Sequence, residues 1–150
     1  MSKAICKNCS GLLLAAALMV PPCAHAVVPD AEAAYRSGNY KLAIKQFLPR
    51  AAKGEAAALY YLGMMNETGK GVRRDEAKAA ARYAAAAKKG HAAAQYRLGR
   101  LYAEGRGVKK DDKEAAGWLR KSAEQGYAEA QYQLGVDYTQ GLGVPQDDKQ

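Results

Sequence analysis

Residues 92–126 read AAAQYRLGRLYAEGRGVKKDDKEAAGWLRKSAEQG, and a related pattern occurs 36 residues earlier and 36 residues later. The invariant Leu-Gly pairs are Leu62-Gly63, Leu98-Gly99 and Leu134-Gly135. Glycine loops and aspartates keep the same interval, at 69–72, 105–108 and 141–144 and at Asp75, Asp111 and Asp147. A period of this length is typical of a solenoid, in which each unit buries its apolar face against its neighbours. The sequence therefore predicts an all-α fold, an α-α solenoid of helix-turn-helix repeats with a 36-residue period.

Each unit reads as two helices joined by a glycine loop. In the middle unit, residues 92–102 are rich in helix formers, and Gly105 ends the helix because glycine adopts the left-handed conformation. Gly107 and Val108 continue the loop, and Asp111 is placed to cap a second helix that runs to residue 124.

Glycine inside a helix is unfavourable, yet Gly63, Gly99 and Gly135 all lie at mid-helix. We expect a neighbouring helix to approach too closely there for a side chain to fit, with the next helix of the same unit as the candidate. The structural positions of the repeat are then Leu62, Gly63, Leu98, Gly99, Tyr102, Gly105, Gly107, Asp111, Trp118, Leu134 and Gly135.

The domain organisation follows from this register. Residues 27–54 form an irregular helix pair, and the repeats occupy 55–90, 91–126 and 127–150, the last of them incomplete. Asp147 stands at the cap position of a second helix, with three residues after it. A truncated array is the favoured interpretation; a frayed end and pairing with another molecule are the alternatives.

The first 26 residues have the order of an export signal. Lys3 and Lys7 precede a short apolar stretch at 11–20, and Ala24-His25-Ala26 predicts cleavage after Ala26. The alternative is a buried helix of the mature fold. Export predicts a periplasmic or secreted protein with no transmembrane segment after cleavage. All the cysteines lie before Val27, so the mature chain forms no disulfide and no thiolate metal site.

The whole sequence carries a formal charge of +8. Such a balance suits nucleic acid, anionic lipid or an acidic partner, and export argues against nucleic acid. The charges are interspersed, which favours a solvated surface, with a weak anionic-surface contact left open at Arg73-Arg74 and Lys109-Lys110. No cofactor or metal is predicted: the glycine loops lack the Lys-Ser/Thr pair of a phosphate loop, and His91 has no cysteine near it.

The pattern AxAQxxLGxxYxxGxGV, followed by an aspartate and a tryptophan-containing helix ending in QG, resembles the Sel1-like repeat family, a relative of the tetratricopeptide repeats. The best match covers 92–126. The preceding unit departs from it, with Asn66 in place of the tyrosine, Leu59 in place of the glutamine and Arg82 in place of the tryptophan. The resemblance implies a protein-protein interaction module, often in bacterial envelopes. Fold alone does not give function.

Comparison of the repeats separates an invariant packing arc from a variable stripe on the first helices. The stripe has an apolar end at Tyr61 and Met64 and a basic middle at Arg97 and Arg100, and it continues to Gln133 and Val136. In tetratricopeptide-like solenoids these helices line the concave face. The stripe would then suit an extended segment with a hydrophobic anchor and an acidic group. The alternative is that surface positions simply vary.

The leading interpretation is an exported adaptor, not an enzyme, that binds a protein or peptide on its concave face. One alternative is a cell-wall or β-lactam-active enzyme, since some Sel1-like proteins have been linked with such activity. Enzymes of that kind use a Ser-x-x-Lys arrangement, and none of the serines of this sequence has a lysine three residues later. The serines are Ser2, Ser10, Ser37 and Ser122. The other alternative is a structural fragment of a longer repeat array.

Overall fold

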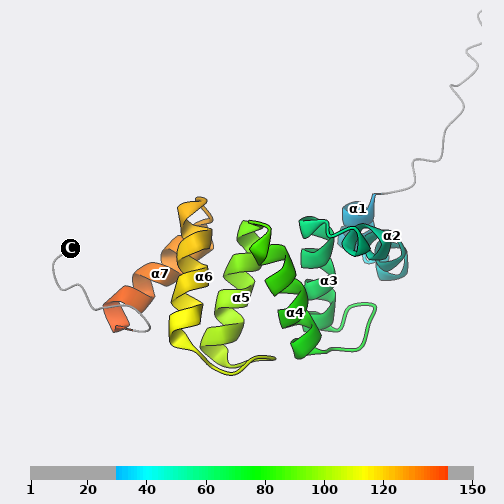
Figure 1. Ribbon diagram of the computed structural model, residues 1–150. Coiled ribbons are helices and arrows are strands. Elements are labelled where there is room, and N and C mark those ends of the chain that lie inside the picture. The colour runs from blue at the N-terminus through cyan, green and yellow to red at the C-terminus, as the bar shows by residue number, and fades with distance from the viewer. Residues whose placement is uncertain (1–29, 142–150) are drawn as a thin grey trace, which may run out of the picture.

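The computed structural model describes residues 30–141, and its regular structure over this range is helical (Figure 1). The helices are α1 (Ala31–Arg36), α2 (Tyr40–Ala52), α3 (Ala56–Thr68), α4 (Glu76–Lys88), α5 (Ala92–Glu104), α6 (Asp112–Glu124) and α7 (Ala128–Gln140). The predicted export signal and Asp147 lie outside the described residues.

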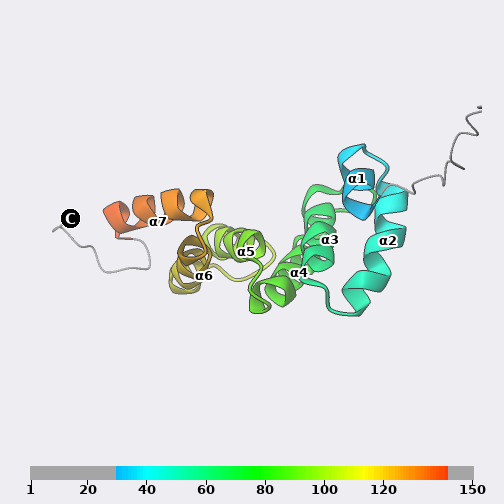
Figure 2. The ribbon, with the colours of Figure 1, turned by 90° about the horizontal axis from the view of Figure 1, so that it is seen from above.

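Helices that follow one another along the chain pack side by side, and the closest pairs are α3 with α4 and α5 with α6. Figure 2 shows the row from above: it curves, with α1, α3, α5 and α7 along the inner side and α4 and α6 along the outer side. The predicted all-α solenoid of helix-turn-helix units is confirmed.

The ends of the helices follow from residues that cap them. The Asp111 carboxylate accepts hydrogen bonds from the backbone nitrogens of Lys113 and Glu114, both at 3.0 Å, and so begins α6. Gly105 ends α5 in the left-handed conformation, with φ of 66°. Because Asp75 and Asp111 cap α4 and α6 while Gly69 and Gly105 end α3 and α5, the lengths of these helices repeat with the sequence.

Two apolar clusters form the core. The first joins α1, α2 and α3 around Phe47, and the second joins α4 and α5 around Tyr83 and Leu98. Val108 and Trp118 are partly buried against the second cluster, so the loop and the following helix are held to it. Alanine supplies most of the remaining core, and its small side chain lets the helices lie close together.

The mid-helix glycines show why the repeat needs them. A Cβ on Gly63 would lie 2.7 Å from the Tyr83 ring, and one on Gly99 would lie 2.9 Å from Cγ of Leu119. In both units the second helix occupies the space of the missing side chain, as expected from the sequence. Gly135 differs, because a Cβ there would meet no described atom within 4 Å.

None of the helices within residues 30–141 is long and apolar enough to cross a membrane. Over the same range, no group of three or more His, Cys, Asp or Glu side chains is arranged to hold a metal ion.

Candidate partner-binding surfaces

We use the name inner stripe for the six variable residues of the first helices. They are Tyr61 and Met64 on α3, Arg97 and Arg100 on α5, and Gln133 and Val136 on α7. Their parent helices all lie along the inner side of the curve (Figure 2). All six side chains are partly exposed.

Tyr61 is packed sideways against the N-terminal helix pair. Its ring stacks on Phe47 with centroids 4.9 Å apart, and the edge of Tyr35 meets it at 5.4 Å. Burial, with the nearby Glu32 carboxylate as a second cause, raises the pKa of the Tyr61 hydroxyl above its usual value. Met64 faces the other way and packs against the α4–α5 cluster. The apolar end of the inner stripe is therefore held in place by neighbouring helices.

The two arginines of the inner stripe have carboxylate partners. Arg97 on α5 pairs with Glu67 on α3 at 3.8 Å, which links two neighbouring inner helices. Arg100 donates from Nε to Glu104 on its own helix at 3.1 Å. These contacts neutralise much of the positive charge that the sequence places at the middle of the stripe.

Sequence reasoning missed the role of Arg106, which lies in the loop after α5. Its guanidinium donates to Glu76 at 2.9 Å and to Glu104 at 3.0 Å, and it lies 3.5 Å from Glu67. The hydrogen bonds that Arg106 donates to Glu104 and Glu76 raise the pKa of its guanidinium further above its already high value. We call these four residues the Arg106 cluster; they tie α3, α4 and α5 together.

The backbone beside Arg106 also crosses the boundary between units. A Cβ on Gly107 would lie 2.2 Å from the carbonyl oxygen of Glu76, so the loop lies directly on the first turn of α4. One feature of the sequence could have indicated this contact between units. Glu67 is acidic, whereas the equivalent positions of the other units hold Ala103 and Thr139. A loop predicted merely to end a helix therefore also joins two units.

On α7, the residues of the inner stripe stay within their own helix. The Gln133 amide donates to Asp137 at 3.0 Å, and the Asp137 side chain is itself buried. Val136 is half-buried. The structure thus places Gln133 and Val136 on the same row of helices as the other four residues, without a direct contact to them among the described interactions.

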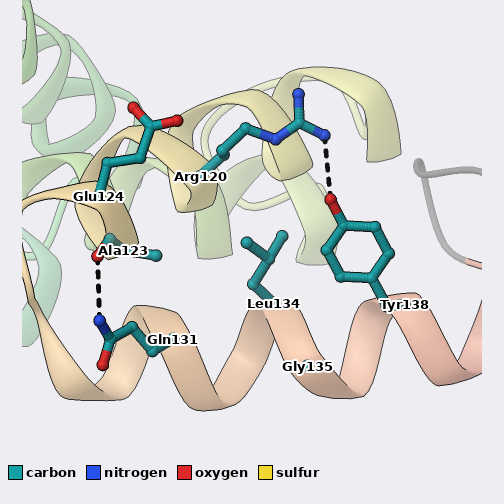
Figure 3. Close-up of a pocket in the computed structure, with 7 residues that line it drawn as sticks. All are labelled: Arg120, Ala123, Glu124, Gln131, Leu134, Gly135 and Tyr138. Carbon is teal, nitrogen blue, oxygen red and sulfur yellow. Dashed lines mark hydrogen bonds between the residues drawn. The ribbon is translucent and has the colours of Figure 1, made fainter. Parts of the chain in front are cut away.

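A groove of about 400 Å³ lies between α6 and α7, at the C-terminal end of the described helices (Figure 3). Leu134 and Tyr138 rise from α7 toward α6, as Figure 3 shows, and Gly135 lies between them. The Gln131 amide donates to the Ala123 carbonyl at 3.1 Å and closes one end of the groove. Its lining comes from Arg120, Ala123, Glu124, Gln131, Leu134, Gly135 and Tyr138.

The fold defines a helical-repeat protein built from consecutive helix-turn-helix units. The Sel1 repeat model matches residues 56–91, 92–127 and 128–150. The chain belongs to the Sel1 repeat family. Proteins of this family generally mediate protein-protein interactions and typically serve as non-catalytic scaffolds.

Two solved structures are similar to the chain. A Sel1 repeat protein from Oxalobacter formigenes is 32% identical, with a TM-score of 0.75, over 78% of this chain and 48% of that one. A protective antigen of uropathogenic Escherichia coli with an SLR fold is 36% identical, with a TM-score of 0.71, over 81% of this chain and 28% of that one. The chain thus spans less than half the length of each. No curated protein matches it.

Proposed function

We propose that this chain is an exported protein-binding module that holds a segment of a partner on the inner stripe. The observation that supports this most is the row of equivalent helices α3, α5 and α7 along the inner side of the curve (Figure 2). The six variable residues of the inner stripe fall on these helices, while the repeated residues Leu62, Gly63, Leu98 and Gly99 are buried in the packing between helices. A surface of this kind can vary without loss of the fold.

The apolar end supplies the anchor. Tyr61 is fixed by Phe47 and Tyr35, and Met64 is fixed by the α4–α5 cluster. Both side chains keep part of their surface exposed. Because they are ordered before a partner arrives, binding costs less conformational entropy than it would on a mobile surface. Tyrosine is also among the residues that most often dominate binding energy.

The two arginines of the inner stripe, Arg97 and Arg100, contribute less to the affinity for a partner than the sequence alone suggests. An acidic group on the partner would have to displace Glu67 from Arg97 or Glu104 from Arg100. Much of the gain from a new ion pair would be offset by the loss of the old one. We therefore propose that the hydrophobic anchor provides most of the affinity, and that binding depends weakly on salt.

The alternative of a β-lactam-active enzyme gains no support from the two described serines: the hydroxyl of Ser37 donates to the Ala34 carbonyl at 3.1 Å. Ser122 is fully buried, and its hydroxyl donates to the carbonyl of Ala92 at 2.8 Å. Because the Ser122 hydroxyl is inaccessible and donates its proton to a backbone carbonyl, we interpret it as a structural residue.

Site-specific photo-cross-linking in the exporting cell tests the binding surface. A cross-linking residue is placed at position 100 or 136 on the inner helices, and at position 113 on α6 as the matched exposed control. We expect positions 100 and 136 to cross-link to one common partner that position 113 does not capture. Equal cross-linking from all three positions would contradict the proposal.

Export is tested separately by mass spectrometry of the chain recovered from the periplasm and from the medium. We expect an N-terminus at Val27. A chain that keeps Met1 and stays inside the cell would contradict the export part of the proposal while leaving the binding surface open to the first experiment.

A further inference from the structure

A tyrosine occupies the fifth position of every helix along the inner side of the curve. These residues are Tyr35 on α1, Tyr60 on α3, Tyr96 on α5 and Tyr132 on α7. Figure 2 shows that the four helices follow one another along that side. An extended segment that crosses them therefore meets one tyrosine in each unit. Tyr35, Tyr60 and Tyr96 are partly exposed, so packing leaves some of their surface available to a partner.

Ring contacts join these tyrosines to other aromatic side chains. Tyr60 stacks on His91 with centroids 4.7 Å apart and meets the edge of Tyr61 at 5.5 Å. In the next unit, Tyr96 meets Tyr127 at 5.4 Å, and Tyr127 precedes α7 as His91 precedes α5. The partly exposed rings form what we call the aromatic belt: Tyr35, Tyr60, Tyr61, His91, Tyr96 and Tyr127.

The aromatic belt offers hydrogen-bond donors to a partner. Arg97 hydrogen-bonds to the hydroxyl of Tyr60. Arg100 does the same to the hydroxyl of Tyr96. Because a guanidinium only donates, each tyrosine accepts with its oxygen and keeps its own O–H to donate. The Glu67 carboxylate beside Arg97 is only 12% exposed, so it is poorly placed to accept a hydrogen bond from a partner.

A proline-rich segment has the chemistry that complements these donors. Proline has no backbone N–H, and a polyproline II helix makes no internal hydrogen bonds, so its carbonyl groups are free to accept. Other extended peptides also carry N–H groups, which would face donors and lose their hydrogen bonds to water. Surfaces lined by aromatic side chains are a recurring means of binding polyproline II segments.

We propose that the aromatic belt binds a proline-rich segment of a partner protein in the polyproline II conformation. Its proline rings pack on the tyrosine rings, and its carbonyl groups accept hydrogen bonds from the hydroxyls of Tyr60 and Tyr96. This rests on the proposed function, since it names the class of segment that the inner side holds. It agrees with an affinity that comes mainly from apolar contact and needs no acidic group on the partner.

The probe is a fluorescein-labelled dodecaproline peptide, whose proline run forms a polyproline II helix without backbone N–H groups. A labelled Gly-Ser peptide of equal length is the control, because it is a flexible chain that keeps its N–H groups. Fluorescence anisotropy is measured against the purified chain. We expect saturable binding of dodecaproline that is about tenfold or more tighter than that of the Gly-Ser peptide.

Two double variants form a matched pair. Tyr60→Phe with Tyr96→Phe removes two hydroxyl donors of the aromatic belt and keeps both rings. Tyr102→Phe with Tyr138→Phe removes two hydroxyls from α5 and α7 outside the belt. Circular dichroism checks that both variants are folded. We expect the first to weaken dodecaproline binding by about fivefold or more, and the second to change it by less than about twofold.

Tyr127→Ser removes a ring of the aromatic belt at a place where the fold tolerates it. Tyr127 begins α7 without a hydrogen bond from its side chain to the backbone, and serine is a favoured residue at such a position. The variant should therefore stay folded. We expect it to weaken dodecaproline binding by about tenfold, because a buried aromatic contact is lost.

Three outcomes would overturn the proposal. They are no saturable binding of dodecaproline, equal affinity for the Gly-Ser peptide, and equal affinity of the two double variants for dodecaproline. Failure here is distinguishable from failure of the proposed function. If positions 100 and 136 cross-link to a common partner while dodecaproline does not bind, the inner side holds a segment of another class, and only the proline-rich assignment is wrong.

Discussion

Leu119 of α6 lies directly over Gly99 of α5, with its Cγ 2.9 Å from the position that a Cβ on the glycine would occupy. The same relationship joins Tyr83 to Gly63 in the preceding unit. Two helices are thus brought together by the absence of a side chain at one position and the presence of a bulky one at another. At Gly135 the side chain is likewise absent, but among residues 30–141 no bulky side chain lies over it.

Alanine at equivalent glycines should therefore have opposite effects on stability. At Gly99 the added methyl group meets Leu119 and the Ala115 carbonyl, and overpacking of this kind costs about 1–3 kcal/mol. At Gly135 no described atom lies within 4 Å of the added methyl group, so Gly135→Ala should raise the free energy of unfolding by about 0.8–1.0 kcal/mol through helix propensity. Urea unfolding measures both. A stabilised Gly99→Ala variant would show that the α5–α6 contact is looser than described.

Truncation of the repeated leucine should also depend on the unit. Leu98 is 1% exposed, and Leu98→Ala should lower the free energy of unfolding by about 2–5 kcal/mol. Leu134 is half-buried beside an open groove, so Leu134→Ala should cost about 1 kcal/mol, because less apolar surface returns to water. Thermal and urea unfolding of the two variants, side by side, checks the difference.

Acid should weaken the Arg106 cluster. Hydrogen bonds from Arg74 and Arg106 hold the pKa of Glu76 below its ordinary value of 4.5. Burial works to raise the pKa of Glu104, but hydrogen bonds from Arg100 and Arg106 outweigh it and lower the pKa. Because Glu76 and Glu104 have lower pKa values in the folded chain than in the unfolded chain, their ionised forms stabilise the fold above pH 4.5. This stability is lost as the pH falls through the lowered pKa values.

We therefore expect the melting temperature of the wild-type chain to fall between neutral pH and about pH 3, and to fall less in Arg106→Gln. Lys113→Gln on α6 removes an exposed positive charge outside the cluster and serves as the control, with the same pH dependence as wild type. An Arg106→Gln variant with an unchanged acid transition would exclude the cluster as its cause.

His91 should titrate below its usual range. Burial lowers the pKa of the imidazole from its ordinary value of 6.5. Its Nδ1 accepts a hydrogen bond from the Ala94 nitrogen at 3.2 Å, and its ring stacks on Tyr60 with centroids 4.7 Å apart. The unfolded chain takes up a proton first as the pH drops below 6.5, so stability falls toward the lowered pKa.

An NMR titration checks this expectation, with a midpoint below 6.5 for the signal that His91→Asn removes. Asparagine keeps a hydrogen-bond acceptor at the start of α5, so the variant should fold, and its stability should lose this part of the pH dependence. A midpoint at or above 6.5 would contradict the burial of the ring.

Most of the fold could be predicted from the sequence, because the residues that begin and end the helices act through local interactions. An acid at Asp111 and a glycine at Gly105 set the ends of helices by their own hydrogen bonds and conformations. The purpose of Gly63 and Gly99 was also predictable, since an unfavourable residue kept at one register needs a packing reason.

The surfaces were predictable only in part. Helical periodicity gives the angle of Tyr61 or Arg97 around its own helix, but not the position of the neighbouring helix that each side chain meets. The stacking of Tyr61 on Phe47 and the pairing of Arg97 with Glu67 depend on that position. Comparison of the repeats did not point to a role for Glu67, because an acid occurs at this position in one unit alone.

The loop at residues 105–107 also has a mechanical consequence. Gly107 lies on the first turn of α4, and the neighbouring Arg106 contacts the carboxylates of Glu67, Glu76 and Glu104. Bending between α4 and α5 therefore has to break several contacts at once. At the other end, α7 is held to α6 beside an open groove. Tension applied to α7 should separate it from α6 first and leave the contacts that join α3, α4 and α5 intact.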